Sequence, residues 1–385
     1  MNGFPRASIV GIGELKPIRS TNGATTLGMI AEVSRLAVLD AGLEPGAIDG
    51  LLVGPQVGET PQHVPATVAE YLGLRPRMAN VVDLGGASGA GMVWRAAAAV
   101  AAGMCEAVLC VLANTREATP PRSPNRNPIR EFDVPFGASG ANVAYAMIKQ
   151  AHMDRFGSRD EDFAAIAAAA RDNAQRNPDA IFYGKPISAP DVLASPLIAT
   201  PLHLLEIAMP VAGGEALVVV SAERARQLRH RAVDLLGAGE KITHRALSQA
   251  RSLTSGPLQP AMTQALMQAE CSVRDMSLYS FYDCYSVMTA VTIEDAGLCP
   301  PGDFGRWLAD NDLGPLGSAP LNTHGGQLGF GQPDLAGGMT HIVEAVRQLR
   351  GTTPLRQIPN AKLALVTGNG ATMSEATALV LGAAA

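Results

Sequence analysis

The segment SGAGMVWRAAAAVAAG, residues 88–103, restricts the fold more than any other part of this sequence. It is rich in alanine, which favours helix, and it carries a single charge, Arg95. A helix that is apolar on every face must be buried on all sides. The segment therefore predicts a helix enclosed by other layers of the protein, as happens when helices lie between two β-sheets.

Short apolar runs alternate with helical patterns along the rest of the chain, which indicates an α/β protein. Strands are expected at residues 7–13, 50–55, 79–85, 106–113, 215–221, 232–239, 276–283, 320–326, 363–370 and 375–382. Helices are expected at residues 25–42, 64–73, 88–103, 159–176, 243–251, 259–269, 284–296 and 336–349.

The sequence contains a weak internal repeat. VVDLGGASGAG, followed by a helix and the strand EAVLCVLA, is matched by LNTHGGQLGFG, followed by a helix and the strand LALVTGNG. Two similar halves of this kind can pack their sheets around central helices. We predict a five-layered α-β-α-β-α sandwich with halves at residues 1–225 and 230–385, and a loop insertion at about 115–205 in the first half.

Composition and charge exclude several classes of function. The net charge of −5 gives no reason to expect nucleic acid as a partner, and the apolar stretch within 88–103 is too short to span a bilayer. The five cysteines show neither a CxxC pair nor zinc spacing, so no metal site is expected. The start, MNGFPRASIVGIGE, does not resemble a targeting segment, and we expect a cytoplasmic protein.

The turn DLGGASGAG, residues 83–91, joins an apolar run to the buried helix. A strand that ends in small residues at a helix N-terminus is a favoured place for a nucleophile or an anion, because the first N–H groups of the helix are unpaired. The tightest part, Gly85, Gly86 and Ala87, has no side chain that can attack a substrate. The sequence thus predicts the setting of an active site without its nucleophile.

Three segments carry a resemblance to a known family: NPDAIFYGKPISAPDVLASPLIATPLHLLEIAMPVAGGEALVVVSAERA (177–225), FYDCYSVMTAVTIEDAGLCPPGDFGRWL (281–308) and LNTHGGQLGFGQPDLAGGMTHIVEAVRQLRG (321–351). Through them the chain resembles the thiolase superfamily, especially the sterol-carrier-protein-type thiolases and the lipid-transfer thiolase-like proteins. The resemblance implies an acyl-coenzyme A (acyl-CoA) substrate, no covalently bound cofactor and a homodimer. It also implies that a small partner protein with a zinc ribbon and an OB-fold can work with the chain.

The chain departs from the thiolase pattern at every position of thiol chemistry. Gly86 stands where thiolases have the nucleophilic cysteine, and Gln332 stands where they have the histidine that activates it. Their second cysteine corresponds to Val366 or Thr367. Without a thiolate and its base, a covalent acyl-enzyme cannot form at this position.

The glycine-rich turns can still polarise a thioester carbonyl through backbone N–H groups. We expect Gly86, Ser88, Gly325, Gly326 and Gly370 to bind the substrate. An enolate that is stabilised in this way needs only one proton shuttle for aldol chemistry. We therefore predict a carbon–carbon lyase, an aldolase that cleaves or forms a β-hydroxyacyl-CoA.

Tyr282 is the candidate proton shuttle. The related thiolases read His-Asp-Cys-Phe where this chain reads YDCY, and thiolase-like aldolases that cleave steroid side-chain thioesters have a tyrosine at the place of Tyr282. A phenol is a weak base unless its neighbours stabilise the anion. A purely structural role for a buried tyrosine therefore stays open.

Three further residues are candidates for catalytic roles beside Tyr282. His324 can assist as an acid or base, or it can be a loop histidine bonded to backbone. Gln332 can donate a hydrogen bond to an enolate oxygen. Asp283 takes part in the chemistry or, as we expect, caps or orients the helix that follows it.

Two alternatives to an aldolase stay open at this point. The chain can be a non-catalytic thiolase-like subunit that binds acyl-CoA or a partner protein. It can also be an acyl-CoA acetyltransferase that uses another nucleophile. A co-purifying zinc-ribbon partner would favour the enzymatic interpretations.

Overall fold

The computed structural model describes residues 6–55, 63–116, 135, 137, 140–228 and 231–384. The first elements are β1 (Ala7–Glu14), α1 (Thr26–Asp40), β2 (Gly50–Val53), α2 (Val64–Tyr71), β3 (Met78–Val81), α3 (Ser88–Ala101) and β4 (Ala107–Asn114). They are followed by α4 (Ala141–Phe156), α5 (Asp160–Ala174), α6 (Ala189–Ala194), β5 (Leu197–Ala199), β6 (Leu202–His203), β7 (Gly213–Ser221) and α7 (Ala222–Ala225). The last elements are β8 (Val233–Ile242), α8 (Leu258–Gln268), β9 (Leu278–Ser280), α9 (Ser286–Asp295), α10 (Phe304–Asp310), α11 (Gly326–Phe330), α12 (Gly337–Arg350), β10 (Leu363–Gly370) and β11 (Glu375–Ala383).

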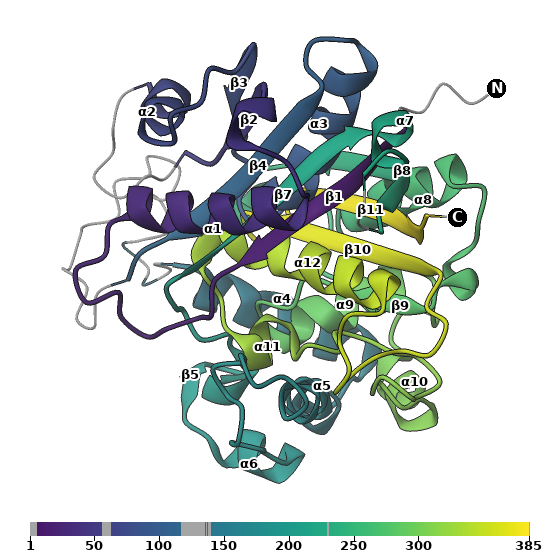
Figure 1. The fold of residues 1–385 in the computed structure, drawn as a ribbon. Coiled ribbons are helices and arrows are strands. Elements are labelled where there is room, and N and C mark those ends of the chain that lie inside the picture. The colour runs from purple at the N-terminus through teal and green to yellow at the C-terminus, as the bar shows by residue number, and fades with distance from the viewer. Residues whose placement is uncertain are drawn as a thin grey trace.

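Within the described residues, nine strands form one mixed sheet in the order β3-β2-β4-β7-β1-β8-β11-β10-β9 (Figure 1). β1 and β8 join its two halves, because Ala7 and Ile9 pair antiparallel with Leu235 and Val233. Hydrogen bonds between β1 and β8 therefore connect the two sheets predicted from the repeat into one sheet.

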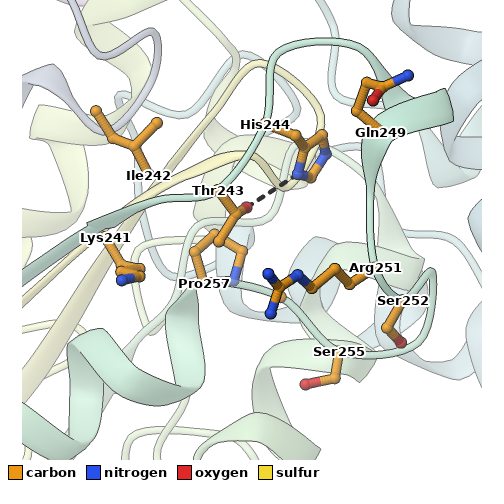
Figure 2. Close-up of a pocket in the computed structure, with 10 residues that line it drawn as sticks. Lys241, Ile242, Thr243, His244, Gln249, Arg251, Ser252, Ser255 and Pro257 are labelled. Atoms are coloured by element: carbon orange, nitrogen blue, oxygen red, sulfur yellow. Dashed lines mark hydrogen bonds between the residues drawn. The ribbon is translucent and has the colours of Figure 1, made fainter.

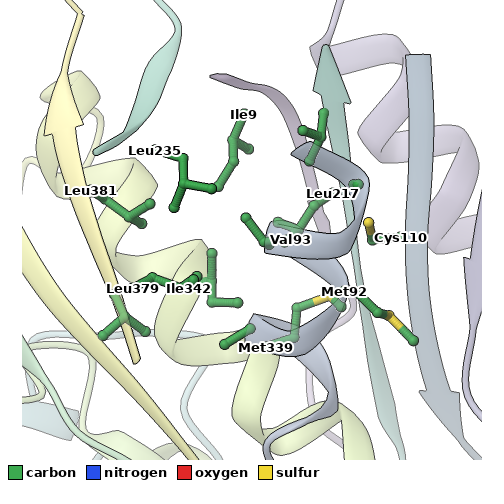
Figure 3. Close-up of a cluster of buried hydrophobic side chains, with 14 of the residues drawn as sticks. Ile9, Met92, Val93, Cys110, Leu217, Leu235, Met339, Ile342, Leu379 and Leu381 are labelled. Atoms are coloured by element: carbon green, nitrogen blue, oxygen red, sulfur yellow. The ribbon is translucent and has the colours of Figure 1, made fainter. Parts of the chain in front are cut away.

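Helices α3 and α12 lie between the two halves of this sheet (Figure 3). Val93 of α3 and Ile342 of α12 belong to one buried cluster with side chains from both halves, among them Ile9, Cys110, Leu217, Leu235, Leu379 and Leu381. A Cβ on Gly89 would lie 3.0 Å from the Cβ of Met339, so this glycine lets the two helices approach closely. Every residue from Ser88 to Val93 is buried. Trp94, Arg95, Ala98 and Val100 are half-buried and Ala101 is exposed, so the helix is enclosed over its first half and less so toward its C-terminal end.

Two outer layers of helices complete the sandwich. α1 and α2 cover the outer face of the N-terminal half, where Val33 and Val68 pack with Val218. α8 and α9 cover the outer face of the C-terminal half, where Ala261 packs with Val380. The layers follow the predicted order α-β-α-β-α, while the domain boundary at residues 225–230 stays a prediction.

The strand predicted at 320–326 is wrong. Asn322, Gly325 and Gly326 have φ angles of +50°, +108° and +58°, which a strand cannot contain. Leu321 alone makes an isolated bridge, to Tyr279. This segment is a turn that leads into α11.

The helix predicted at 243–251 is also wrong. Only Leu247–Gln249 forms a short 3₁₀ helix. The Thr243 N–H donates to the carbonyl of Ser374 at 2.9 Å, so the chain follows the sheet edge beyond β8 instead of turning into a helix.

The insertion between β4 and β7 is more helical than the sequence predicts, because it contains α4 and α6 besides the expected α5. Helices α5 and α6 lie at the lower end of the molecule in Figure 1. Lys149 of α4 is fully buried and donates to both carboxylate oxygens of Glu206, at 3.0 and 2.9 Å. Glu206 also accepts from Ser286 Oγ at 2.7 Å. This network ties the insertion to α9. The arginine-rich front of the insertion, 117–134, lies outside the described residues.

The described part of the chain has neither a membrane-spanning helix nor a cluster of metal-binding side chains. No helix in it is long and apolar enough to cross a membrane. No group of three or more His, Cys, Asp or Glu side chains within it is arranged to hold a metal ion.

Candidate active site

The turn of Gly85 and Gly86 lies just before α3, where glycine-rich turns of the two halves meet. Gly85 has a φ of +53°, and a Cβ on it would lie 2.9 Å from the Cα of Gly370. A Cβ on Gly86 would overlap the hydroxyl and the ring of Tyr282. The space that a cysteine side chain needs at this turn is therefore filled by a phenol.

Tyr282 follows β9 and is 4% exposed. Its N–H donates to Thr367 Oγ1 at 3.0 Å, and its hydroxyl accepts from Gln332 Nε2 at 3.0 Å. Burial raises the pKa of the phenol well above its usual value, and this effect outweighs the nearby amides of Gln332 and Gln327, which lower it. Tyr282 is thus a neutral phenol at pH 7 that is held at both its backbone and its hydroxyl.

Gln332 links this phenol to the segment before β7. The backbone N–H of Gln332 donates to Met209 O at 2.8 Å, and its backbone carbonyl accepts from the Val211 N–H at 3.1 Å. Its side-chain nitrogen, Nε2, donates to the Tyr282 hydroxyl and, at 3.4 Å, to Asp334 O. The sequence predicts Gln332 as a donor to an enolate, whereas in the structure this donor is engaged by the phenol.

Asp283 is 1% exposed and points to the turn of the C-terminal half. Its carboxylate accepts from the N–H groups of Gln327, at 2.6 Å, and Leu328, at 3.4 Å, at the start of α11. His341 Nε2 lies 3.3 Å from Asp283 Oδ1. Asp283 therefore caps α11, which comes 43 residues later (326 − 283), and not α9, the helix that directly follows it in sequence.

His324 is buried in the C-terminal turn and is 2% exposed. Its ring packs against Phe330, with centroids 5.8 Å apart, and against His341, at 5.2 Å. Neither ring nitrogen has a hydrogen-bond partner among the described residues. Burial, together with His341, lowers the pKa of His324 well below its usual value, so the ring is neutral at pH 7 and is a weak base.

The remaining predicted substrate-binding residues shape the turns. Ser88 is fully buried, and its Oγ accepts from the Leu84 N–H at 2.9 Å, which closes the turn before α3. Gly370 faces Leu84 O so closely that a Cβ would overlap it. Gly325 packs against Ala174 of α5, where a Cβ would lie 2.8 Å from the Cβ of that residue. These contacts keep both turns free of side chains.

The cysteines do not replace the missing nucleophile. Cys284, the thiol closest in sequence to Tyr282, is 9% exposed, and burial raises its pKa to about 12. Burial likewise raises the pKa of Cys105 to about 11. A protonated thiol is a poor nucleophile.

Three buried polar residues beside the site are missed by the sequence analysis: Gln327, His341 and Asn369. Gln327 is fully buried and follows the Gly-Gly turn directly. Asn369 is 2% exposed, and its amide nitrogen donates to Tyr145 Oη at 2.8 Å. Gln327 and Asn369 stand in the two glycine-rich turns, and this position is a sequence signal from which both could have been predicted. His341 lies inside α12, and the sequence carries no comparable signal for it.

A separate polar pocket of about 360 Å³ lies beyond the end of β8 (Figure 2). It is lined by Lys241, Thr243, His244 and Arg251, together with two serines and other residues. One of its lining residues, Gly256, lies against Met373, which is three residues after Gly370. The pocket contains none of the residues that the sequence singles out.

The fold and the site define a thiolase-type architecture in which a tyrosine occupies the place of the nucleophilic thiol. Residues 239–383 match the family model described as "Thiolase C-terminal domain-like". The steroid side-chain-cleaving aldolase of Thermomonospora curvata is 33% identical and covers 98% of both chains. The 17-hydroxy-3-oxo-4-pregnene-20-carboxyl-CoA lyase of Mycobacterium tuberculosis is 32% identical over 98% of this chain and 99% of its own.

A solved structure, the Ltp2-ChsH2(DUF35) aldolase, superposes on this chain with a TM-score of 0.89. Its sequence is 32% identical, and the match covers 98% of both chains. The chain belongs to the thiolase superfamily and is an aldolase-like member of it. The resemblance and the fold class inferred from the sequence are confirmed.

Proposed function

We propose that this chain is a carbon–carbon lyase that cleaves a β-hydroxyacyl-CoA by a retro-aldol reaction. One observation carries the proposal: the Tyr282 phenol fills the space at Gly86 that a covalent mechanism needs for a thiol. The names of the whole-length relatives, an aldolase and a CoA lyase, support the same class of reaction.

The reaction needs one proton shuttle, and we assign this role to Tyr282. As a phenolate, Tyr282 accepts the proton of the β-hydroxyl group. The Cα–Cβ bond then breaks, the β-carbon leaves as an aldehyde or ketone, and the electron pair passes into the enolate of the thioester. The phenol returns its proton to the α-carbon, which yields the shortened acyl-CoA and restores the phenolate.

Fixed donors around the phenol make these steps accessible. The Gln332 N–H that donates to the Tyr282 hydroxyl stabilises the phenolate. Backbone N–H groups of the turns at Gly86 and Gly370 are suited to an enolate oxygen, because donors held in place before the reaction need no reorganisation. His324 is a weak base in this setting, so proton transfer rests on Tyr282.

The proposal is tested with a panel of synthetic β-hydroxyacyl-CoA thioesters, including ones with a bulky tertiary alcohol. Each cleavage should release one aldehyde or ketone for each shortened acyl-CoA, and iodoacetamide should leave the activity largely intact. Mass spectrometry should detect no acylated protein. A stoichiometric acyl adduct on a cysteine, without release of a carbonyl product, would favour an acetyltransferase instead.

We also propose that a small zinc-ribbon and OB-fold protein takes part in the reaction. The Ltp2-ChsH2(DUF35) aldolase is named as an assembly of two proteins, which supports a partner of this kind. The lyase assay is therefore run with and without such a protein. Binding of acyl-CoA without cleavage under both conditions would favour a non-catalytic binding subunit.

A homodimer through the edge of the sheet completes the proposal. Among the described strands β3 lies at the edge of the sheet and pairs with β2 alone, and its Val81 is 42% exposed. Unpaired strand edges readily pair with a second chain, and a stable dimer should bury more than about 1,000 Å². Sedimentation should give a dimer at micromolar concentration, whereas a stable monomer would contradict this arrangement.

A further inference from the structure

Gln327 is a buried side chain whose amide atoms are left unpaired by the described part of the chain. It belongs to α11 and has no exposed surface. Neither its amide nitrogen nor its amide oxygen has a hydrogen-bond partner among the described residues. Buried amides in native proteins are nearly always paired, so an unpaired one this close to a reaction site points to a ligand atom.

The backbone of Gln327 is fixed, and its side chain points toward Gln332. The Gln327 N–H donates to Asp283 Oδ1 at 2.6 Å, which holds the residue at the start of α11. A Cβ built on Gly337 would lie 2.9 Å from Gln327 Nε2 and 3.2 Å from Gln332 Oε1. The two amides therefore face the same small space over Gly337, and the amide of Gln327 is close enough to Tyr282 to lower the pKa of the phenol.

The two amides differ in what they have left to donate. The Gln332 nitrogen already donates to the Tyr282 hydroxyl and to Asp334 O. Asn369, the other buried amide at the site, donates to Tyr145. Gln327 alone among these three donates to no described residue. A preorganised donor of this kind is worth most where negative charge develops during the reaction.

We propose that Gln327 is a substrate-binding residue whose amide N–H donates to the thioester carbonyl oxygen and to the enolate oxygen that forms from it. Gln332, by contrast, positions and stabilises the Tyr282 phenolate. The inference rests on the proposed retro-aldol function and adds to it the side-chain donor for the oxyanion.

Gln327→Leu tests this role, because leucine has a similar volume and no donor. Loss of one oxyanion donor costs about 10²–10³ in kcat, and we expect a loss of that size at every pH. The thermal midpoint should stay the same or rise, because a buried unpaired amide is removed. A lower midpoint together with an unchanged kcat would make Gln327 structural and overturn the proposal.

Gln332→Leu is the matched control. It removes the bond to the phenol and keeps Gln327, so it should lower kcat and leave the affinity for acetyl-CoA unchanged, whereas Gln327→Leu should lower both. Equal losses of acetyl-CoA affinity in the two variants would place both amides on the carbonyl and contradict the division of roles.

Titration with acetyl-CoA separates this inference from the proposed function. Acetyl-CoA has the thioester carbonyl but no β-hydroxyl group, so it binds without being cleaved. Loss of a hydrogen bond to its carbonyl should weaken binding to Gln327→Leu by about 2–10-fold. If the wild-type protein cleaves no β-hydroxyacyl-CoA, the reaction is wrong, but weaker acetyl-CoA binding still supports Gln327 as a carbonyl donor. Equal affinities in wild type and variant would overturn it.

Discussion

Two glycine-rich turns, one in each half of the molecule, are filled by neighbouring residues of a single segment. A Cβ on Gly86, in the N-terminal half, would overlap the Tyr282 phenol, and a Cβ on Gly326, in the C-terminal half, would overlap the Asp283 carboxylate. Successive residues of an extended segment point to opposite sides, so one segment after β9 serves both turns.

The two side chains differ in how fully their polar atoms are paired. The Asp283 carboxylate accepts from the first N–H groups of α11 and lies against His341, so both of its oxygens are engaged. The Tyr282 hydroxyl accepts one bond from Gln332, and burial holds it neutral. In both turns a side chain fills the space beside a glycine. In one turn this side chain, Asp283, is a structural cap, and in the other, in our proposal, Tyr282 is a reactive group.

Tyr282→Phe should have the largest effect on activity. It removes only the hydroxyl, and the ring still fills the space at Gly86, so the denaturation midpoint should not change. Loss of the proton shuttle should reduce kcat by about 10²–10⁴. Carbonyl release from a β-hydroxyacyl-CoA measures this, and a wild-type rate in the variant would make both turns purely structural.

The pH dependence tests whether the phenol in the first turn must ionise. Burial raises its pKa, so the phenolate is a minor species at neutral pH, and its fraction grows about tenfold with each pH unit below that pKa. Cleavage should therefore accelerate about 10²-fold between pH 7 and pH 9 without a plateau, and Tyr282→Phe should abolish this slope. A plateau near pH 7 in the wild type would assign the base to another group.

Gly86→Ala should disturb the first turn by steric overlap alone. The added methyl group collides with the Tyr282 ring and hydroxyl, and overpacking of this kind costs about 1–3 kcal/mol. We expect a similar loss in unfolding free energy and a fall in kcat of about 10–10². Gly46→Ala is the control, because a Cβ there meets no atom within 4 Å. Equal behaviour of the two variants would show that the phenol can move away freely.

The sequence predicts the architecture well where the signal is local. The helix α3 and the alternation of strands and helices can be predicted because the apolar character of buried segments is present in the residues themselves. The turn at Gly325 and Gly326 is misread as a strand, because its positive φ angles depend on the fit against α5 and Asp283 and not on the apolar run before it.

The site is predicted only in part, for a related reason. The loss of the thiol at Gly86 is visible in the motif, but Tyr282 lies 196 residues away (282 − 86), and no local pattern reveals that its phenol fills the vacated space. Gln327 directly follows the Gly325-Gly326 turn, yet its importance comes from the lack of hydrogen-bond partners for its amide among the described residues. The helix that Asp283 caps is likewise set by tertiary contacts.

Asp283→Asn should have the smallest effect on the rate and an evident effect on stability. Asparagine keeps the size of the side chain, but it replaces a charge-assisted acceptor of the Gln327 N–H with a weaker one and brings an NH₂ group among donors. Hydrogen bonds to charged groups contribute about 1.5–3 kcal/mol, so the unfolding free energy from urea denaturation should fall by about that amount. The rate should fall less than tenfold, because the Tyr282 backbone and hydroxyl are held by Thr367 and Gln332 and not by Asp283. If kcat fell as far as in Tyr282→Phe while the stability stayed unchanged, Asp283 would belong to the chemistry, and the contrast between the two turns would be lost.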